Sequence, residues 1–336
     1  MTCVLDNRTA CPAVWHLMPD ADGGEAGLLV VKASFCLSTG RLAAAESQCQ
    51  VKMLPKHVPI ADLPLSDAQF RLLGDRAKQT ILWEDHDLSP PKPNFNLLVQ
   101  ATVTVPPGGA GDYVTAGLKV GNKTVGVKVF GPRYRLQGLL GKELKRLDGA
   151  AAEVPLNYAF SGGEGSLLET PDNKEQELSL LPWFEPIVQP GAEVLLHEYF
   201  GLSHCPVGAA HRRKFAGTYD EQWKSERAPL LPEDFDRRFW NDASPTLQWP
   251  DPLVAGTSIR MANLSRVPLV VGTVPSMTWR VKGYDDVGKL QCDVRLRNDT
   301  LLLEPDADRM TFTWRALFSK GPAGGLPKRL LIEALA

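Results

Sequence analysis

The chain has 336 residues, with 37 Lys and Arg against 39 Asp and Glu, so its formal net charge is −2. This balance gives no electrostatic reason to expect a nucleic acid or an anionic membrane as partner. The 27 prolines and 29 glycines are spread along the chain, which favours many short elements over long helices.

The sequence shows no membrane-spanning or export segment. It has no run of about 18 apolar residues, and its start lacks the basic and apolar regions of a secretory signal. The six cysteines form no C-x-x-C pair, and several lie in strand-like apolar runs, which is typical of buried thiols in a reducing compartment. We therefore expect a soluble cytoplasmic protein.

Strands dominate the first half of the chain. Leu28–Leu37 is too apolar on both faces to be an exposed edge strand, which predicts a strand buried on both sides. Leu97–Val105 is rich in β-branched residues and predicts a second strand. Val114–Val120 and Lys123–Phe130 flank Gly121-Asn122, and this pattern predicts an antiparallel hairpin with one buried face.

Two segments predict helices, and one predicts a loop. Tyr134–Leu147 places its leucines on one helical stripe, and Ser66–Ile81 shows a weaker helical pattern. Between Ser161 and Glu177 the chain is rich in Gly and then polar, so we expect a long exposed loop there.

The last third returns to short strands with turn residues between them, which is typical of a sandwich or barrel. The expected strands are Ser258–Leu264, Val267–Val274, Thr278–Val281, Leu290–Leu296, Leu301–Glu304 and Met310–Phe318. We predict a mainly β fold of antiparallel sandwich or barrel-like sheets with a few short helices. It forms a single domain over residues 1–336, or two lobes (1–160 and 178–336) joined by the loop 161–177.

The segment Gly217–Pro245 mixes large aromatic residues with many charges. Pro229 and Pro232 prevent one continuous helix between Trp223 and Glu233. Because charged groups are rarely buried unless they are paired, the segment must either lock two layers together or present a binding surface.

Within this segment we expect local structural roles rather than catalysis. Asp220 is suited to cap a short helix that contains Trp223, and Arg227 to form an ion pair. A second helical turn is expected to begin at Asp234-Phe235-Asp236. Its inward side chains would be Phe235, Phe239 and Trp240, with Arg237 and Arg238 outside.

A second charged group precedes the strand at Leu97. Glu84, Asp85 and Asp87, together with Lys92, could form an acidic contact patch or a cation site. We favour a charged turn in which Lys92 screens the acids. Arg133, directly after a strand, is expected to pair with one of these carboxylates.

The chain lacks the usual signatures of a catalytic or metal site. His197, His204, Cys205 and His211 include zinc-type ligands, but their spacing matches no familiar zinc site, so ordinary polar loop residues are the favoured interpretation. Neither a Gly-x-Ser-x-Gly nucleophile nor a phosphate-binding loop occurs. We expect no cofactor and no bound metal.

Four motifs carry a resemblance to a known family. They are Glu84–Leu88 with Pro91-Lys92-Pro93, Phe130–Arg133, Pro155–Gly163, and Gly217–Asn241. In this order and spacing the chain resembles the domain of unknown function 2169 family over about three-quarters of its length. Members of this family are typically encoded beside type VI secretion spike proteins and toxins.

The resemblance implies an adaptor or chaperone that binds a toxin effector and loads it onto the secretion spike. The chain departs from the family pattern at Asn96, at Glu164–Glu177 and at Ala243–Gln248. We therefore expect the scaffold to carry over, while the toxin or spike partner can differ.

Two functions from different classes follow. The first is the adaptor, not an enzyme, with a secreted toxin effector and a spike protein as partners and with neither nucleic acid nor membrane. Its partner-binding candidates are Glu84, Asp85, Asp87, Lys92, Tyr219, Asp220, Trp223, Arg227, Asp234, Phe235 and Trp240. The alternative is a glycosidase-like hydrolase with two of Asp85, Asp87, Asp220 and Asp234 facing each other across a cleft at about 5–10 Å.

Overall fold

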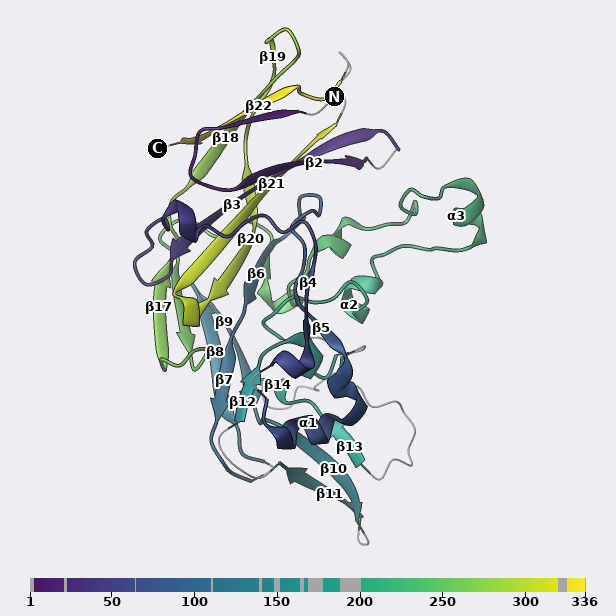
Figure 1. Ribbon diagram of the computed structural model, residues 1–336, viewed down its shortest axis with the longest axis vertical. Helices are drawn as coiled ribbons and strands as arrows, with labels where there is room; N and C mark the ends of the chain where they lie inside the picture. The colour runs from purple at the N-terminus through teal and green to yellow at the C-terminus, as the bar shows by residue number, and fades with distance from the viewer. Residues whose placement is uncertain are drawn as a thin grey trace.

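The fold of the protein is mainly β, as predicted. The computed structural model describes residues 3–20, 23–63, 65–109, 111–138, 141–147, 152–163, 166–168, 178–187, 201–319 and 325–335. In these ranges most sheets are antiparallel, no sheet closes into a barrel, and no helix is long and apolar enough to cross a membrane. Figure 1 shows an elongated molecule with both chain ends in the sheet at one end of it.

The largest sheet has six strands in the order β15-β6-β20-β21-β3-β2. Within this sheet β6 runs parallel to β20, and every other pair of neighbouring strands is antiparallel. As predicted from Leu28–Leu37, β3 is buried on both faces. The strands are β2 (Ala13–Pro19), β3 (Glu25–Cys36), β6 (Phe95–Val99), β15 (Gln248–Trp249), β20 (Arg297–Glu304) and β21 (Arg309–Ser319).

A five-stranded sheet follows the order β14-β9-β8-β16-β17. The predicted hairpin is confirmed, because β8 and β9 pair around a turn in which Gly121 has a φ of 57°. That positive φ is accessible to glycine without a steric penalty. The strands are β8 (Val114–Val120), β9 (Lys123–Val129), β14 (Phe184–Pro186), β16 (Ser258–Ala262) and β17 (Leu269–Thr273).

Smaller sheets lie at the two ends of the molecule. One has the order β1-β22-β18-β19, with β1 (Val4–Asn7), β18 (Thr278–Tyr284), β19 (Leu290–Arg295) and β22 (Arg329–Leu335). Another has the order β11-β10-β13, with β10 (Arg133–Gly138), β11 (Gly141–Arg146) and β13 (Leu178–Leu181). Two further pairs join β4 (Lys56–Pro59) to β5 (Thr80–Glu84) and β7 (Thr102–Val105) to β12 (Ala152–Pro155).

The helices of the described ranges are short. The α-helices are α1 (Asp67–Leu73), α2 (Ala210–Arg213) and α3 (Glu221–Glu226). The 3-10 helices are η1 (Ala45–Ser47), η2 (Ile60–Asp62), η3 (Gly74–Lys78), η4 (Tyr158–Phe160), η5 (Arg237–Trp240), η6 (Pro245–Leu247) and η7 (Pro305–Ala307).

Three expectations differ from the structure. The helix predicted over Tyr134–Leu147 is wrong, because this segment forms β10 and β11, which pair with each other around Gly141. The single strand predicted over Leu97–Val105 is split, and its halves β6 and β7 join different sheets. The weak helix over Ser66–Ile81 is shorter than expected, since α1 ends at Leu73, the 3-10 helix η3 follows to Lys78, and β5 begins at Thr80.

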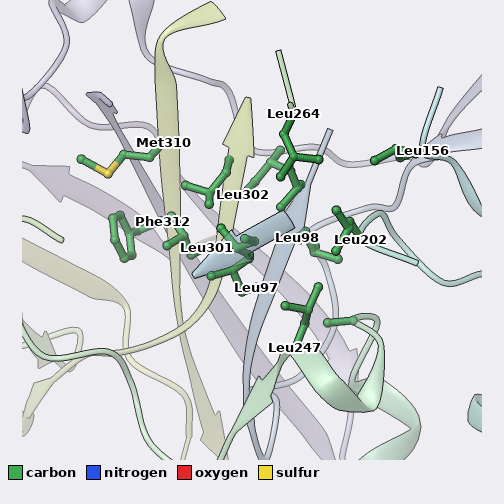
Figure 2. Packing of buried hydrophobic residues seen from close by; sticks show 14 of the residues in the cluster. Leu97, Leu98, Leu156, Leu202, Leu247, Leu264, Leu301, Leu302, Met310 and Phe312 are labelled. Carbon is green, nitrogen blue, oxygen red and sulfur yellow. The ribbon is translucent and has the colours of Figure 1, made fainter. Parts of the chain in front are cut away.

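One hydrophobic cluster connects the sheets. It includes residues from both sides of the loop 161–177. Of this loop only 161–163 and 166–168 are described, and they are mostly buried, with Leu167 and Leu168 in the cluster, so the prediction of an exposed loop is wrong for this part. Figure 2 shows Leu98 of β6 beside Leu202 and Leu247, with Leu301 of β20 on the neighbouring strand. The sheets therefore mix strands from residues 1–160 and 178–336 rather than dividing at this loop.

A substitution of one of two paired tryptophans in this cluster tests the assignment of the core. Trp279 is 1% exposed, and its ring lies edge-on to Trp314 at a centroid distance of 5.8 Å. We expect Trp279→Ala to lower the free energy of unfolding by about 3–5 kcal/mol in urea titrations, because it opens a large cavity. Val287→Ala, at a side chain that is 82% exposed, should change it by less than about 0.5 kcal/mol, and equal effects would contradict this assignment of the core.

Candidate functional site

A buried ion pair joins Lys92 of the first motif to Asp242, which directly follows the fourth motif. Lys92 Nζ is 2.5 Å from Asp242 Oδ1, and His204 Nδ1 is 3.0 Å from the other oxygen of Asp242. Burial alone would raise the pKa of Asp242, but Lys92 and His204 hold that pKa well below its ordinary value. Asp242 is therefore a carboxylate that neutralises Lys92 inside the protein.

A second group of buried charges continues this cluster into the large sheet. Asp87 lies 2.9 Å from Lys32 Nζ on β3 and 3.8 Å from the Arg315 guanidinium on β21. Arg315 also pairs with Asp299 of β20, whose carboxylate accepts a hydrogen bond from the Lys92 amide at 3.1 Å. Against the effect of burial, Lys32 and Arg315 lower the pKa of Asp87. We call Lys32, Asp87, Lys92, His204, Asp242, Asp299 and Arg315 the buried charge cluster.

Arg212 joins this region to the segment after α2. Its guanidinium lies 3.3 Å from Asp85 and donates to the carbonyl of Cys205 at 2.7 Å. It also donates to the carbonyl of Phe239 at 3.0 Å. Since Arg212 is only 3% exposed, these contacts fix the chain around Phe239 against the loop that contains Asp85.

These contacts correct several predictions. Glu84, Asp87 and Lys92 are buried, and Asp85 is nearly so, which leaves no acidic contact patch at the surface. Glu84 pairs with Lys52, while Lys92 pairs with Asp242 instead of screening the neighbouring acids. Arg133 likewise pairs with Glu185 and not with a carboxylate of this loop. Asp242 was not identified from the sequence as the partner of Lys92, although Asp242 directly follows Asn241, the last residue of the fourth motif.

The aromatic and charged segment forms a projecting arm. The amide of Asp236 donates to the carbonyl of Phe215 at 3.0 Å, so the chain leaves and returns at one point. Figure 1 shows α3 far from the sheets at the end of this excursion. We call residues 216–235 the arm, and none of them belongs to the main hydrophobic cluster.

Side-chain contacts hold the arm together. As predicted, the Asp220 carboxylate caps α3 by accepting from the Trp223 amide at 2.8 Å. Trp223 Nε1 donates to the carbonyl of Leu230 at 2.8 Å, and Arg227 Nε donates to the carbonyl of Leu231 at 2.5 Å. The Tyr219 ring meets Trp223 edge-on at 4.6 Å. Tyr219, Trp223 and Arg227 are thus brought together on α3 and its flanks.

The base of the arm is closed by Thr218 and Asp234. The amide and hydroxyl of Thr218 donate to Asp234 at 2.9 and 2.8 Å, and these bonds lower the pKa of the Asp234 carboxyl. Gly217 has a φ of 80°, and a Cβ there would lie 2.7 Å from Asp234. A side chain at position 217 would therefore disturb this closure.

The second predicted helical turn is confirmed below the arm. Asp236 caps η5 by accepting from the Arg238 amide at 2.8 Å. Phe235, Phe239 and Trp240 are half-buried and pack edge-on or tilted at 5.4 to 5.6 Å. This aromatic group joins the arm to the Phe239 carbonyl that Arg212 binds.

The arm presents an open, acidic and aromatic surface. It carries five carboxylates against two cations, a net charge of −3. Tyr219 is 52% and Leu231 37% exposed. An open pocket of about 550 Å³ is lined by Thr218, Asp220, Gln222, Trp223, Glu226, Arg227, Pro232, Glu233 and Asp234.

The histidine and cysteine group does not assemble a metal site in the part of the chain that is described. Cys205 Sγ lies 3.4 Å from His211 Nδ1, while His204 faces Asp242. Burial, with Arg212 and Lys214, lowers the pKa of His211 to about 4, and burial raises the pKa of Cys205. Among the described side chains no group of three or more such ligands occurs, and His197 lies outside them.

The buried charge cluster can be tested through Lys92. We expect Lys92→Met to lower the free energy of unfolding by about 3–5 kcal/mol, because Asp242 and Asp299 lose a cation that offsets their burial. Lys224→Met replaces a cation of the arm whose side chain is 68% exposed and should cost less than about 0.5 kcal/mol. Similar denaturation midpoints for the two variants would show that the buried pair does not stabilise the fold.

Comparison with known proteins places the chain in a family. No curated protein and no solved structure matches it. One family model, described as an uncharacterized protein conserved in bacteria (DUF2169), matches residues 22–315 and so covers both the buried charge cluster and the arm. The chain therefore belongs to this bacterial family of uncharacterized proteins, DUF2169.

Proposed function

We propose that the protein is a cytoplasmic adaptor or chaperone that binds a type VI secretion toxin effector and helps to load it onto the secretion spike. The observation that carries this proposal is the arm. It projects from the sheets, shares no residue with the main hydrophobic cluster, and exposes aromatic and charged side chains.

The energetics of the arm favour a binding role. Ordering each residue costs about 1–2 kcal/mol of backbone entropy, and the arm gains little core burial in return. It is nevertheless held by the bonds of Asp220, Trp223, Arg227 and Asp234. A pre-ordered surface of this kind reduces the entropy lost on binding and so strengthens the binding of a partner.

The composition of the arm indicates the kind of partner surface. Tyr, Trp and Arg are enriched among residues that dominate binding energy, and Tyr219, Trp223 and Arg227 lie together here. With a net charge of −3, the arm suits a basic effector surface that has an apolar pocket for the aromatic pair.

The secretion context rests on the motif resemblance. The matches at Glu84–Lys92, Phe130–Arg133, Pro155–Gly163 and Gly217–Asn241 resemble adaptors encoded beside spike proteins and toxins. In this chain the first of these motifs contributes to the buried charge cluster and the fourth contains the arm. The proposed partner surface therefore lies within the part of the chain that carries the resemblance.

No observation favours the hydrolase. Asp85 and Asp87 are held in ion pairs with Arg212, Lys32 and Arg315. On the arm, Asp220 caps α3. The pKa of Asp234 is lowered, whereas a general acid near neutral pH needs a raised one.

The proposal predicts the effect of trimming the arm. The tagged protein, purified from its host with an active secretion system, should recover a toxin-like protein that mass spectrometry identifies. Tyr219→Ala and Trp223→Ala should each weaken binding of that toxin by about tenfold or more, the usual effect of losing a hot-spot aromatic. Their melting temperatures should stay close to that of the wild type, because the arm is outside the main cluster.

Two further variants separate binding from folding. Trp240→Ala should lower the melting temperature, since its ring packs on Phe235 and Phe239. Val287→Ala, at an exposed site in the turn between β18 and β19, should change neither property. Unchanged melting together with full toxin capture by Trp223→Ala would overturn the role of the arm.

A further inference from the structure

The strand β17 forms an open edge of the five-stranded sheet. It pairs with β16 on one side, and no described strand pairs with its other side. Figure 1 places β17 at the outer margin of the molecule, on the side opposite α3. This edge is therefore a surface separate from the arm.

The hydrogen bonds between β16 and β17 show which backbone groups of β17 face outward. The Asn263 amide donates to the Pro268 carbonyl at 2.8 Å, and the Val274 amide donates to the Thr257 carbonyl at 2.9 Å. Bonded and non-bonded positions alternate along an antiparallel pair, so Val270 and Gly272 bond to β16. The N–H and C=O groups of Leu269 and Val271 consequently point away from β16 to the open edge. Those of Thr273 point the same way, but the turn at Gly40 lies beside the Thr273 carbonyl, since a Cβ at Gly40 would be 3.8 Å from its oxygen.

The edge lacks the features that usually prevent strand addition. Within Leu269–Thr273 there is neither a charged residue nor a proline, although such residues commonly protect edge strands. Leu269 is 55% and Val271 47% exposed. By contrast, the opposite edge of the same sheet is β14, which has three residues and ends at Pro186.

Two exposed cations lie on the same face of the sheet as Val271, Arg260 one strand and Lys119 two strands in from the edge. The register aligns Val271 with Arg260 of β16 and Arg260 with Lys119 of β8, and both cations are exposed. Like charges directly opposite each other on a sheet are destabilising. Neither cation forms an ion pair with any described residue. The other exposed positions on this face of the three strands are uncharged, and they are Thr115, Ser258, Ala262, Leu269 and Thr273.

From this geometry we infer that the β17 edge binds an extended segment of a partner protein as a sixth strand. The open N–H and C=O groups of Leu269 and Val271 supply the backbone bonds, as in other strand additions. On the face shared with Val271, the segment carries apolar side chains and at least one Asp or Glu, which Arg260 and Lys119 attract. A second copy of this chain is a poorer occupant, because its β17 carries no carboxylate and the neighbouring strands β16 and β8 bring the same two cations.

The experiment selects ligands from displayed random ten-residue peptides on the full-length protein and measures their affinities as synthetic peptides. The selected peptides should be rich in β-branched or aromatic residues with Asp or Glu two positions away, and poor in Lys, Arg and Pro. Val271→Pro should bind them about tenfold or more weakly, since it removes one outward donor. That donor makes no bond to β16, so this variant should keep its melting temperature.

Arg260→Glu provides a second variant that leaves the backbone intact. It should weaken binding of the acidic peptides by about tenfold or more without lowering the melting temperature, because a carboxylate would then lie opposite Lys119. Trp223→Ala on the arm and Val287→Ala should bind the peptides as the wild type does. Selection of peptides without the apolar and acidic pattern, or equal binding by Val271→Pro, would overturn the inference. A dimer that Val271→Pro dissociates would do so as well, because the occupant would then be a second copy.

Discussion

The structure depends on the buried pair of Lys92 and Asp242. Each of these residues is 5% exposed, and they lie 150 positions apart in the chain. Two charges removed from water are tolerable only when each faces the other and the remaining polar atoms are bonded. His204 and Asp299 supply those further contacts. The pair therefore holds the loop after β5, the segment after α2 and the large sheet in one arrangement.

The arm depends on this arrangement for its position. Arg212 binds both Asp85 and the carbonyl of Phe239, and the aromatic group of Phe235, Phe239 and Trp240 continues from there to the arm. A rigid charged base thus supports a projecting surface that the main cluster does not include. The β17 edge lies on the other side of the molecule, so two partners could be held at once without competing for one surface.

Local sequence patterns predicted much of the fold but not its pairings. The β8–β9 hairpin, the Asp220 cap and η5 follow from neighbouring residues, and all three are present. The leucine stripe of Tyr134–Leu147 was misleading, because the segment pairs in β10 and β11 and its Gly138 and Gly141 weaken a helix. Lys92 with Asp242, and Arg133 with Glu185, are contacts between distant segments, and no local pattern specifies them.

Excising the arm tests the central claim most directly. Because the Asp236 amide and the Phe215 carbonyl are 3.0 Å apart, residues 217–234 can be replaced by two glycines without moving the ends. Quantitative mass spectrometry would then compare the proteins that co-purify with the full chain and with the armless chain from the same host. We predict that the armless chain melts like the full chain and no longer recovers the toxin effector. Recovery of the same effector in equal amount would contradict the assignment of the arm as the binding site.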